Sequence, residues 1–119
     1  MSTTTATADW RTTPLAEQEL GPVATRILEE NDRVRIWEMV LEPGEELALH
    51  KHDLDFINVN LEGDRLAGYV HSEATGRFTE DIEVEIHPGN HYYTPRGGAE
   101  IAKNTGTKLY RALLIELKD

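Results

Sequence analysis

Two histidines one residue apart, His50 and His52, constrain this chain most. They stand in residues 44–63, which read GEELALHKHDLDFINVNLEG and follow a turn signal at Pro43 and Gly44. Because side chains alternate faces along a strand, both imidazoles should lie on one side of the same strand and be able to converge on one ion. An HxH pair alone is weak evidence, so the pattern needs support from a second segment.

That second segment is residues 89–104, GNHYYTPRGGAEIAKN. It is also framed by glycine, and it lies far enough along the chain to form another strand. We therefore expect it to bring a further ligand to the histidines.

The chain after Pro22 consists of short apolar runs separated by turn residues. Such runs, bounded by Gly, Pro, Asn and Asp, are typical of strands. The predicted strands are residues 23–29, 34–41, 47–52, 55–61, 65–71, 77–87, 91–94, 100–103 and 109–117. Nine short strands without a convincing helix predict an all-β sandwich or barrel.

Regular alternation would place Leu47 and Leu49 on the face opposite His50 and His52. If the histidines face the interior, the leucine face needs a cover of its own. A second protomer would provide it, which predicts a homodimer. The N-terminal segment is an equal alternative.

Composition narrows the functions. A chain of 119 residues forms one domain, and we expect residues 1–21 to be a flexible tail and lead-in and residues 22–119 to be the barrel domain. The net charge of -10 argues against nucleic acid and membrane surfaces as partners. The chain has no cysteine, so any metal must be held by nitrogen and oxygen. Without a leader-like or membrane-spanning segment, we expect a cytoplasmic protein.

The spacing of both segments resembles the two motifs of the cupin superfamily. The first motif, G-x5-HxH with a later glycine, corresponds to Gly44, His50, His52 and Gly63. The second, G-x5-PxG followed by a ligand and an asparagine, corresponds to Gly89, Pro95, Gly97, Glu100 and Asn104. The resemblance implies a double-stranded β-helix, that is, a jelly-roll barrel, usually dimeric and with a metal site inside. The family includes dioxygenases, lyases, isomerases and proteins that bind without catalysis, so the fold does not fix the function.

This chain departs from the family pattern at two ligand positions. Phe56 stands where the first motif expects Glu, and Glu100 stands where the second expects His. The remaining set is His50, His52 and Glu100. Two imidazoles and one carboxylate suit divalent Fe, Mn, Ni or Zn.

Two functions follow from this set. The first is a metal-dependent enzyme of the lyase, isomerase or dioxygenase type, acting on a small polar molecule inside the barrel. The alternative is a metal-free or vestigial cupin that binds a small ligand without catalysis, with the histidines lining its pocket and Glu100 on the surface.

Other residues complete the predicted site. Phe56, Asn58 and Asn60 share one strand face, which is either a polar substrate pocket or a solvent face. His91 and Tyr93 also share a face and are the nearest candidates for proton transfer.

Overall fold

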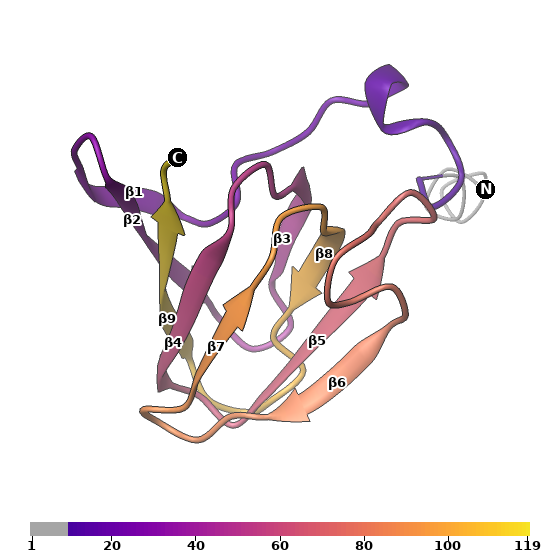
Figure 1. The fold of residues 1–119 in the computed structure, drawn as a ribbon. Helices are drawn as coiled ribbons and strands as arrows, with labels where there is room; N and C mark the ends of the chain where they lie inside the picture. The colour runs from indigo at the N-terminus through magenta and orange to yellow at the C-terminus, as the bar shows by residue number, and fades with distance from the viewer. Residues whose placement is uncertain (1–9) are drawn as a thin grey trace.

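The computed structural model describes residues 10–119, so the predicted tail of residues 1–9 lies outside the described residues. Within the described part, nine strands form two antiparallel sheets that face each other (Figure 1). In chain order the strands are β1 (Arg26–Glu30), β2 (Val34–Leu41), β3 (Glu46–Lys51), β4 (Phe56–Glu62), β5 (Arg65–Val70), β6 (Ile82–Glu85), β7 (His91–Thr94), β8 (Ala99–Lys103) and β9 (Tyr110–Leu117). One short 3-10 turn, η1 (Leu15–Glu17), precedes them. The all-β prediction is confirmed.

The two sheets interleave segments that are distant in sequence. The five-stranded sheet has the order β1-β2-β9-β4-β7, and the four-stranded sheet has the order β3-β8-β5-β6. This order brings β8 beside β3, with Glu100 opposite His50. The second motif therefore reaches the histidines, as the sequence predicted.

Strand β6 is shorter than the predicted run of residues 77–87. It pairs with β5 only from Gly68 opposite Ile82 to Arg65 opposite Glu85. One residue earlier, the carboxylate of Asp81 accepts the backbone N–H of Val70 at 2.9 Å. A side chain thus takes the hydrogen bond that a continuing strand would have made, and residues before 82 form a loop.

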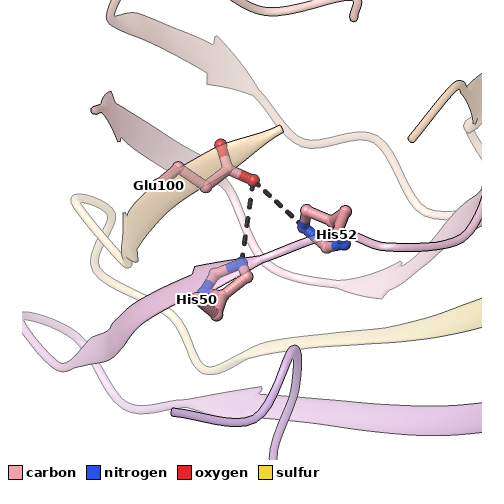
Figure 2. Close-up of side chains that lie close together, drawn as sticks. All are labelled: His50, His52 and Glu100. Carbon is pink, nitrogen blue, oxygen red and sulfur yellow. Dashed lines mark ion pairs between the residues drawn. The ribbon is translucent and has the colours of Figure 1, made fainter. Parts of the chain in front are cut away.

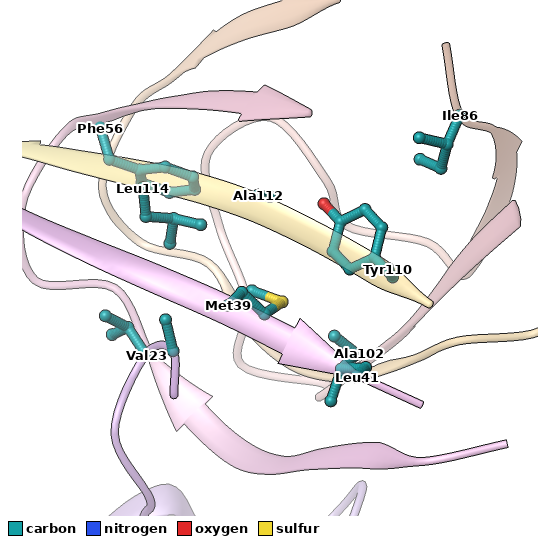
Figure 3. Close-up of a cluster of buried hydrophobic side chains, with 10 residues drawn as sticks. Val23, Met39, Leu41, Phe56, Ile86, Ala102, Tyr110, Ala112 and Leu114 are labelled. Atoms are coloured by element: carbon teal, nitrogen blue, oxygen red, sulfur yellow. The ribbon is translucent and has the colours of Figure 1, made fainter. Parts of the chain in front are cut away.

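The inner faces of the two sheets enclose the main apolar core (Figure 3). On β9 the burial alternates strictly, because every second side chain from Tyr110 onward points between the sheets. The buried members of this core are Val23, Ala24, Met39, Leu41, Phe56, Ile86, Ala102, Tyr110, Ala112 and Leu114. A continuous wall of this kind keeps bulk water away from side chains that point inward.

A β-bulge interrupts β3. Leu47 lies opposite Ala102 and His50 lies opposite Glu100, so three steps on β3 match two on β8. Leu47 therefore packs against the inner core, whereas Leu49 packs in a separate cluster with Leu15. The prediction that Leu47 and Leu49 share one face was wrong, because the extra residue shifts the alternation between them.

The N-terminal segment, residues 10–22, lies against the four-stranded sheet. Leu15 is buried beside Leu49 and Ala99, and the N–H of Gly21 donates to the carbonyl of Leu49 at 2.8 Å. Of the two predicted covers for Leu49, the structure shows this segment. The homodimer stays a prediction.

His71 fastens the same segment to the barrel. Its side chain is fully buried, its Nε2 lies 2.7 Å from the carbonyl of Thr13, and its Nδ1 accepts the N–H of Glu73 at 2.9 Å. Both ring nitrogens are therefore used when the imidazole is neutral with its proton on Nε2. His71 has a structural role.

Two further acids are buried with cationic partners. Glu38 lies between the guanidinium groups of Arg26 and Arg111, at 2.8 and 2.7 Å. Glu116 accepts hydrogen bonds from Arg35 and from the indole of Trp37. Both carboxylates are thus neutralised within the protein.

None of the helical segments in residues 10–119 has the length and apolar character required to cross a bilayer.

Candidate metal centre

His50, His52 and Glu100 converge inside the barrel (Figure 2). Oε2 of Glu100 lies 3.9 Å from Nε2 of His50 and 3.6 Å from Nε2 of His52. One potential ligand atom from each residue lies within 4.8 Å of the other two. These separations are too long for hydrogen bonds, so the donor atoms face a common point without being used up by one another.

The strand backbone orients His50. Its Nδ1 lies 2.9 Å from the carbonyl of Ala48, which can only accept a hydrogen bond. Nδ1 therefore carries the proton, and the lone pair of Nε2 points toward Glu100. The ring of His52 stands edge-on to His50, with centroids 4.8 Å apart.

His52 is held by packing. Phe56 stacks on its ring at a centroid distance of 4.3 Å, and Nδ1 of His52 is buried without a hydrogen-bond partner. Phe56, which replaces the acid expected from the family pattern, thus positions a histidine by contact. A buried polar atom without a partner is uncommon in a protein interior, and here it means that no hydrogen bond to the protein fixes the proton on either nitrogen of this ring.

The electrostatics favour ligand binding at neutral pH. Burial lowers the pKa of His50 to about 4, helped by His52 and opposed by Glu100 and the Ala48 hydrogen bond. Burial alone would raise the pKa of Glu100, but the two imidazoles beside it more than offset this effect and hold it below its usual value. The cluster thus contains a neutral imidazole and a carboxylate anion, which together provide one negative charge for a cation.

The three residues line a cavity of about 210 Å³ between the two sheets. Most of its wall is apolar and comes from both sheets: Met39, Phe56, Leu66, Ile82, Val84, Ile86 and Leu114. Phe56, Asn58 and Asn60 all line it, so of the two orientations expected for this strand face the structure shows the inward one. The wall is less polar than the sequence suggested.

A neutral polar network forms part of the wall. The hydroxyl of Tyr110 donates to Oδ1 of Asn60 at 2.7 Å, and Nδ2 of Asn58 donates to the same oxygen at 3.0 Å. Asn60 in turn donates to Asn90, which donates to the hydroxyl oxygen of Tyr92. Burial raises the pKa of Tyr110, so its phenol keeps its proton. Asn60 is thus a fixed part of the wall.

The structure corrects the prediction for His91 and Tyr93. Tyr93 lies opposite Ile57 and His91 opposite Val59, on the outer face of β4 and β7. Neither residue lines the cavity, and the hydroxyl of Tyr93 donates to Asp55 at 2.6 Å. Tyr92 occupies the inward position instead. The sequence indicated which residues of β7 share a face. It did not indicate which face points inward, because pairing with β4 determines that orientation.

Sequence reasoning also missed several residues of the cavity. Arg77 and Phe78 come from the loop that was predicted as part of a strand, and Tyr110 from the last strand. Tyr110 could have been found from the alternating pattern of residues 109–117. The loop residues carry no sequence signal that points to the cavity.

The residues present fit a divalent ion. A neutral imidazole, a second imidazole without a protein partner on Nδ1 and an ionised carboxylate form a nitrogen and oxygen donor set. Such a set suits Fe, Mn, Ni or Zn and leaves positions open for other ligands. No fourth acid or histidine completes the cluster among residues 10–119.

The comparisons with known proteins establish the fold. No family model and no curated protein sequence matches the chain. Among solved structures, it is similar to a cupin domain from Bordetella pertussis, with a TM-score of 0.67 and 22% identity over 86% of this chain and 98% of that one. It is also similar to an RmlC-like cupin with a double-stranded β-helix fold from Methanocaldococcus jannaschii, with a TM-score of 0.59 and 16% identity over 84% and 87% of the two chains.

A third similar structure is a DMSP lyase, DddQ, from Ruegeria pomeroyi. The TM-score is 0.54 with 19% identity, over 75% of this chain and 40% of the lyase. At these identities the similarity concerns the fold and carries no residue role with it.

Proposed function

We propose that this chain, which has the double-stranded β-helix fold of the cupins, is a divalent-metal-dependent enzyme that acts on a small molecule inside its barrel. The single observation that carries the proposal is the convergence of His50, His52 and Glu100 on one point of a mostly apolar cavity. A carboxylate whose pKa is held low, beside the neutral imidazole of His50 in such a wall, is typical of a functional site.

These three residues would hold the ion, and the bound ion would supply Lewis-acid polarisation of a substrate oxygen or a binding position for O₂. That chemistry is common to lyases, isomerases and dioxygenases.

The rest of the cavity positions the substrate. A substrate that fills the space between the apolar walls would displace water, which strengthens polar interactions within the site. Asn58 stands beside the fixed oxygen of Asn60 and can orient a substrate polar group. Tyr92 carries a hydroxyl whose oxygen accepts from Asn90, so Oη of Tyr92 is the position where a proton can be held next to the substrate. Tyr92 thus replaces His91 and Tyr93, which were the candidates predicted from sequence.

The volume and the lining of the cavity also narrow the class of substrate. A cavity of about 210 Å³ has the volume of roughly seven water molecules. The predominance of aliphatic and aromatic lining favours a molecule with a compact apolar body that carries oxygen at its end, in place of the uniformly polar molecule expected from sequence.

A second function is supported by one observation. Phe56 packs on His52 where a fourth ligand would stand, so the protein offers three donors at most. A protein with this cluster but without a metal would be a binder of small molecules, with His52 and Phe56 as part of its wall.

Metal analysis separates the two functions. Protein purified without chelator, or loaded anaerobically with Fe(II), Mn(II), Ni(II) or Zn(II), should contain close to one ion per chain. His50→Ala should lose it, whereas His87→Ala, which changes an exposed histidine outside the cavity, should keep it. A wild-type protein that takes up none of the four ions would refute the enzyme and leave the binder.

A further inference from the structure

Arg77 is placed at the rim of the cavity. It lies in the loop between β5 and β6 and is exposed, yet it also lines the cavity. Its guanidinium carbon is 5.2 Å from the ring centroid of Phe78 and 5.4 Å from that of Tyr92. Its Nη1 donates to the carbonyl of Tyr93 at 3.2 Å. Two rings and one backbone oxygen thus hold the cationic group against edge strand β7.

Arg77 has no acidic partner in the part of the chain that the structure describes. The arginines at positions 11, 26, 35, 65, 96 and 111 each form an ion pair with a carboxylate. Arg77 uses one N–H on Tyr93 and forms no ion pair, although acids outnumber bases 22 to 12 in this chain. A guanidinium has five N–H donors, so most of its hydrogen-bonding capacity remains for a ligand.

No other arginine or lysine among residues 10–119 lines this cavity. The remaining polar side chains of the wall are those of the anionic metal cluster, the neutral network around Asn60 and Tyr110, and the uncharged Thr94. An anionic group on the substrate would therefore be attracted to one position on the protein, the rim at Arg77. A planar guanidinium matches a carboxylate, which it can bind through two parallel hydrogen bonds.

We propose that Arg77 binds the carboxylate of the substrate, and that the substrate class is a small monocarboxylate with a compact apolar body. The apolar body occupies the cavity, the carboxylate meets Arg77 at the rim, and the remaining end faces His50, His52 and Glu100. A single guanidinium balances a single negative charge. A phosphate dianion would bring a second charge into a cavity that already contains the carboxylate of Glu100, with no further cation to offset it.

The role of the metal-facing end rests on the proposed function, whereas the binding of the carboxylate rests on Arg77 alone. The two are separated by titrating benzoate and benzamide, which have the same shape and differ in charge, into metal-loaded protein and into His50→Ala. Calorimetry should show that the metal-loaded wild type binds benzoate about tenfold or more tightly than benzamide. Arg77→Gln should remove this preference, and Arg77→Lys should restore part of it.

The matched control is Arg33→Gln. Arg33 is exposed, forms no ion pair within residues 10–119 and does not line the cavity, so its replacement removes the same charge elsewhere. It should leave the preference for benzoate intact, and both Gln variants should melt close to the wild type.

Three results would overturn the proposal: no benzoate binding by the wild type, equal binding of benzoate and benzamide, or an equal loss in Arg77→Gln and Arg33→Gln. If His50→Ala keeps the Arg77-dependent preference, the carboxylate is bound at the rim and not by the ion. If the wild type binds no metal but keeps that preference, the proposal that Arg77 binds a carboxylate is supported and the proposal of a metal-dependent enzyme is refuted.

Discussion

Carboxylates point away from bulk water in two regions of this barrel, fully buried at Glu38 and Glu116 and half-buried at Glu100, and their charges are compensated in different ways. Glu38 and Glu116, which are 6% and 3% exposed, each accept hydrogen bonds from arginine at 2.7 to 3.1 Å. Glu100 lies in the cavity, and its nearest basic groups are the imidazoles of His50 and His52 at 3.9 and 3.6 Å. Burial keeps His50 neutral by lowering its pKa to about 4.

The difference shows where the protein lacks a cation. An ionised carboxylate removed from bulk water is costly unless a positive charge and hydrogen bonds compensate it. At Glu38 and Glu116 the compensation is built into the chain. Glu100 forms no ion pair with arginine or lysine among residues 10–119, and its neighbouring nitrogen donors would suit a metal ion as the compensating cation.

The largest effect that would test this comparison is expected for Glu100→Gln. The variant keeps the size of the side chain but removes the charge, so divalent-metal affinity should fall by more than about 100-fold, beyond the effect of losing a group that only supports a ligand. Competition with a chromophoric chelator measures it. Unchanged affinity would show that Glu100 does not bind the ion.

Glu116→Gln is the counterpart in the arginine-neutralised region. It removes the buried one of the two carboxylates that Arg35 contacts, the other being Glu30, and it weakens the short bond from Trp37, so the free energy of unfolding should fall by about 1–3 kcal/mol in urea denaturation. The metal content should not change. A loss of metal without a loss of stability would reverse the roles of the two regions. Glu29→Gln, at an exposed residue of β1, serves as the control and should not change stability measurably.

A smaller effect is expected when the carboxylate of Glu100 is displaced without removing its charge. A Cβ at Gly68 would lie 3.0 Å from Oε1 of Glu100, which is closer than ordinary contact. Gly68→Ala should therefore shift this carboxylate and lower metal affinity by about tenfold. Gly98→Ala is the matched control, because its Cβ would lie 3.5 Å from the ring of His52, an ordinary contact. Equal affinities of both variants would contradict the assigned position of Glu100.

The smallest effect concerns Asp55, an acid that the protein neutralises near its surface. Hydrogen bonds from Tyr93 and Arg96 lower its pKa to about 2, from an ordinary 3.8. A lowered pKa means that the ionised form stabilises the fold above about pH 4 and that this stabilisation is lost as the pH falls toward 2. Asp55→Asn should therefore melt below the wild type at pH 7, and the two melting temperatures should converge below pH 4. A difference independent of pH would assign the effect to shape.

Much of this arrangement could be predicted from sequence, because it depends on local chemistry. Gly44 and Gly89 adopt positive φ angles of 85° and 93°, the turn conformation that glycine favours, and each stands at the start of one motif. Regular alternation correctly placed Phe56, Asn58 and Asn60 on one face, which the structure shows to be the face toward the cavity. The spacing of the two motifs was enough to bring Glu100 to the histidines.

What could not be predicted depends on pairing between distant strands. The bulge at Leu47 becomes visible only against β8, and the outward direction of His91 and Tyr93 is set by their partners on β4. Arg77 reaches the cavity from a loop whose path is fixed by the hydrogen bond between Asp81 and Val70. None of these contacts can be recognised from a periodic pattern of residues in the sequence.

The N-terminal segment has a mechanical consequence for the histidines. Leu15 packs on the outer side of Leu49, and Gly21 is hydrogen-bonded to the carbonyl of Leu49. Leu49 is the residue directly before His50, so one peptide link joins the anchoring point of this segment to the first imidazole. Proteolytic removal of the segment, or a fusion tag that displaces it, would free Leu49. The resulting movement would pass through this peptide link to His50, although Leu15 and Gly21 themselves do not line the cavity.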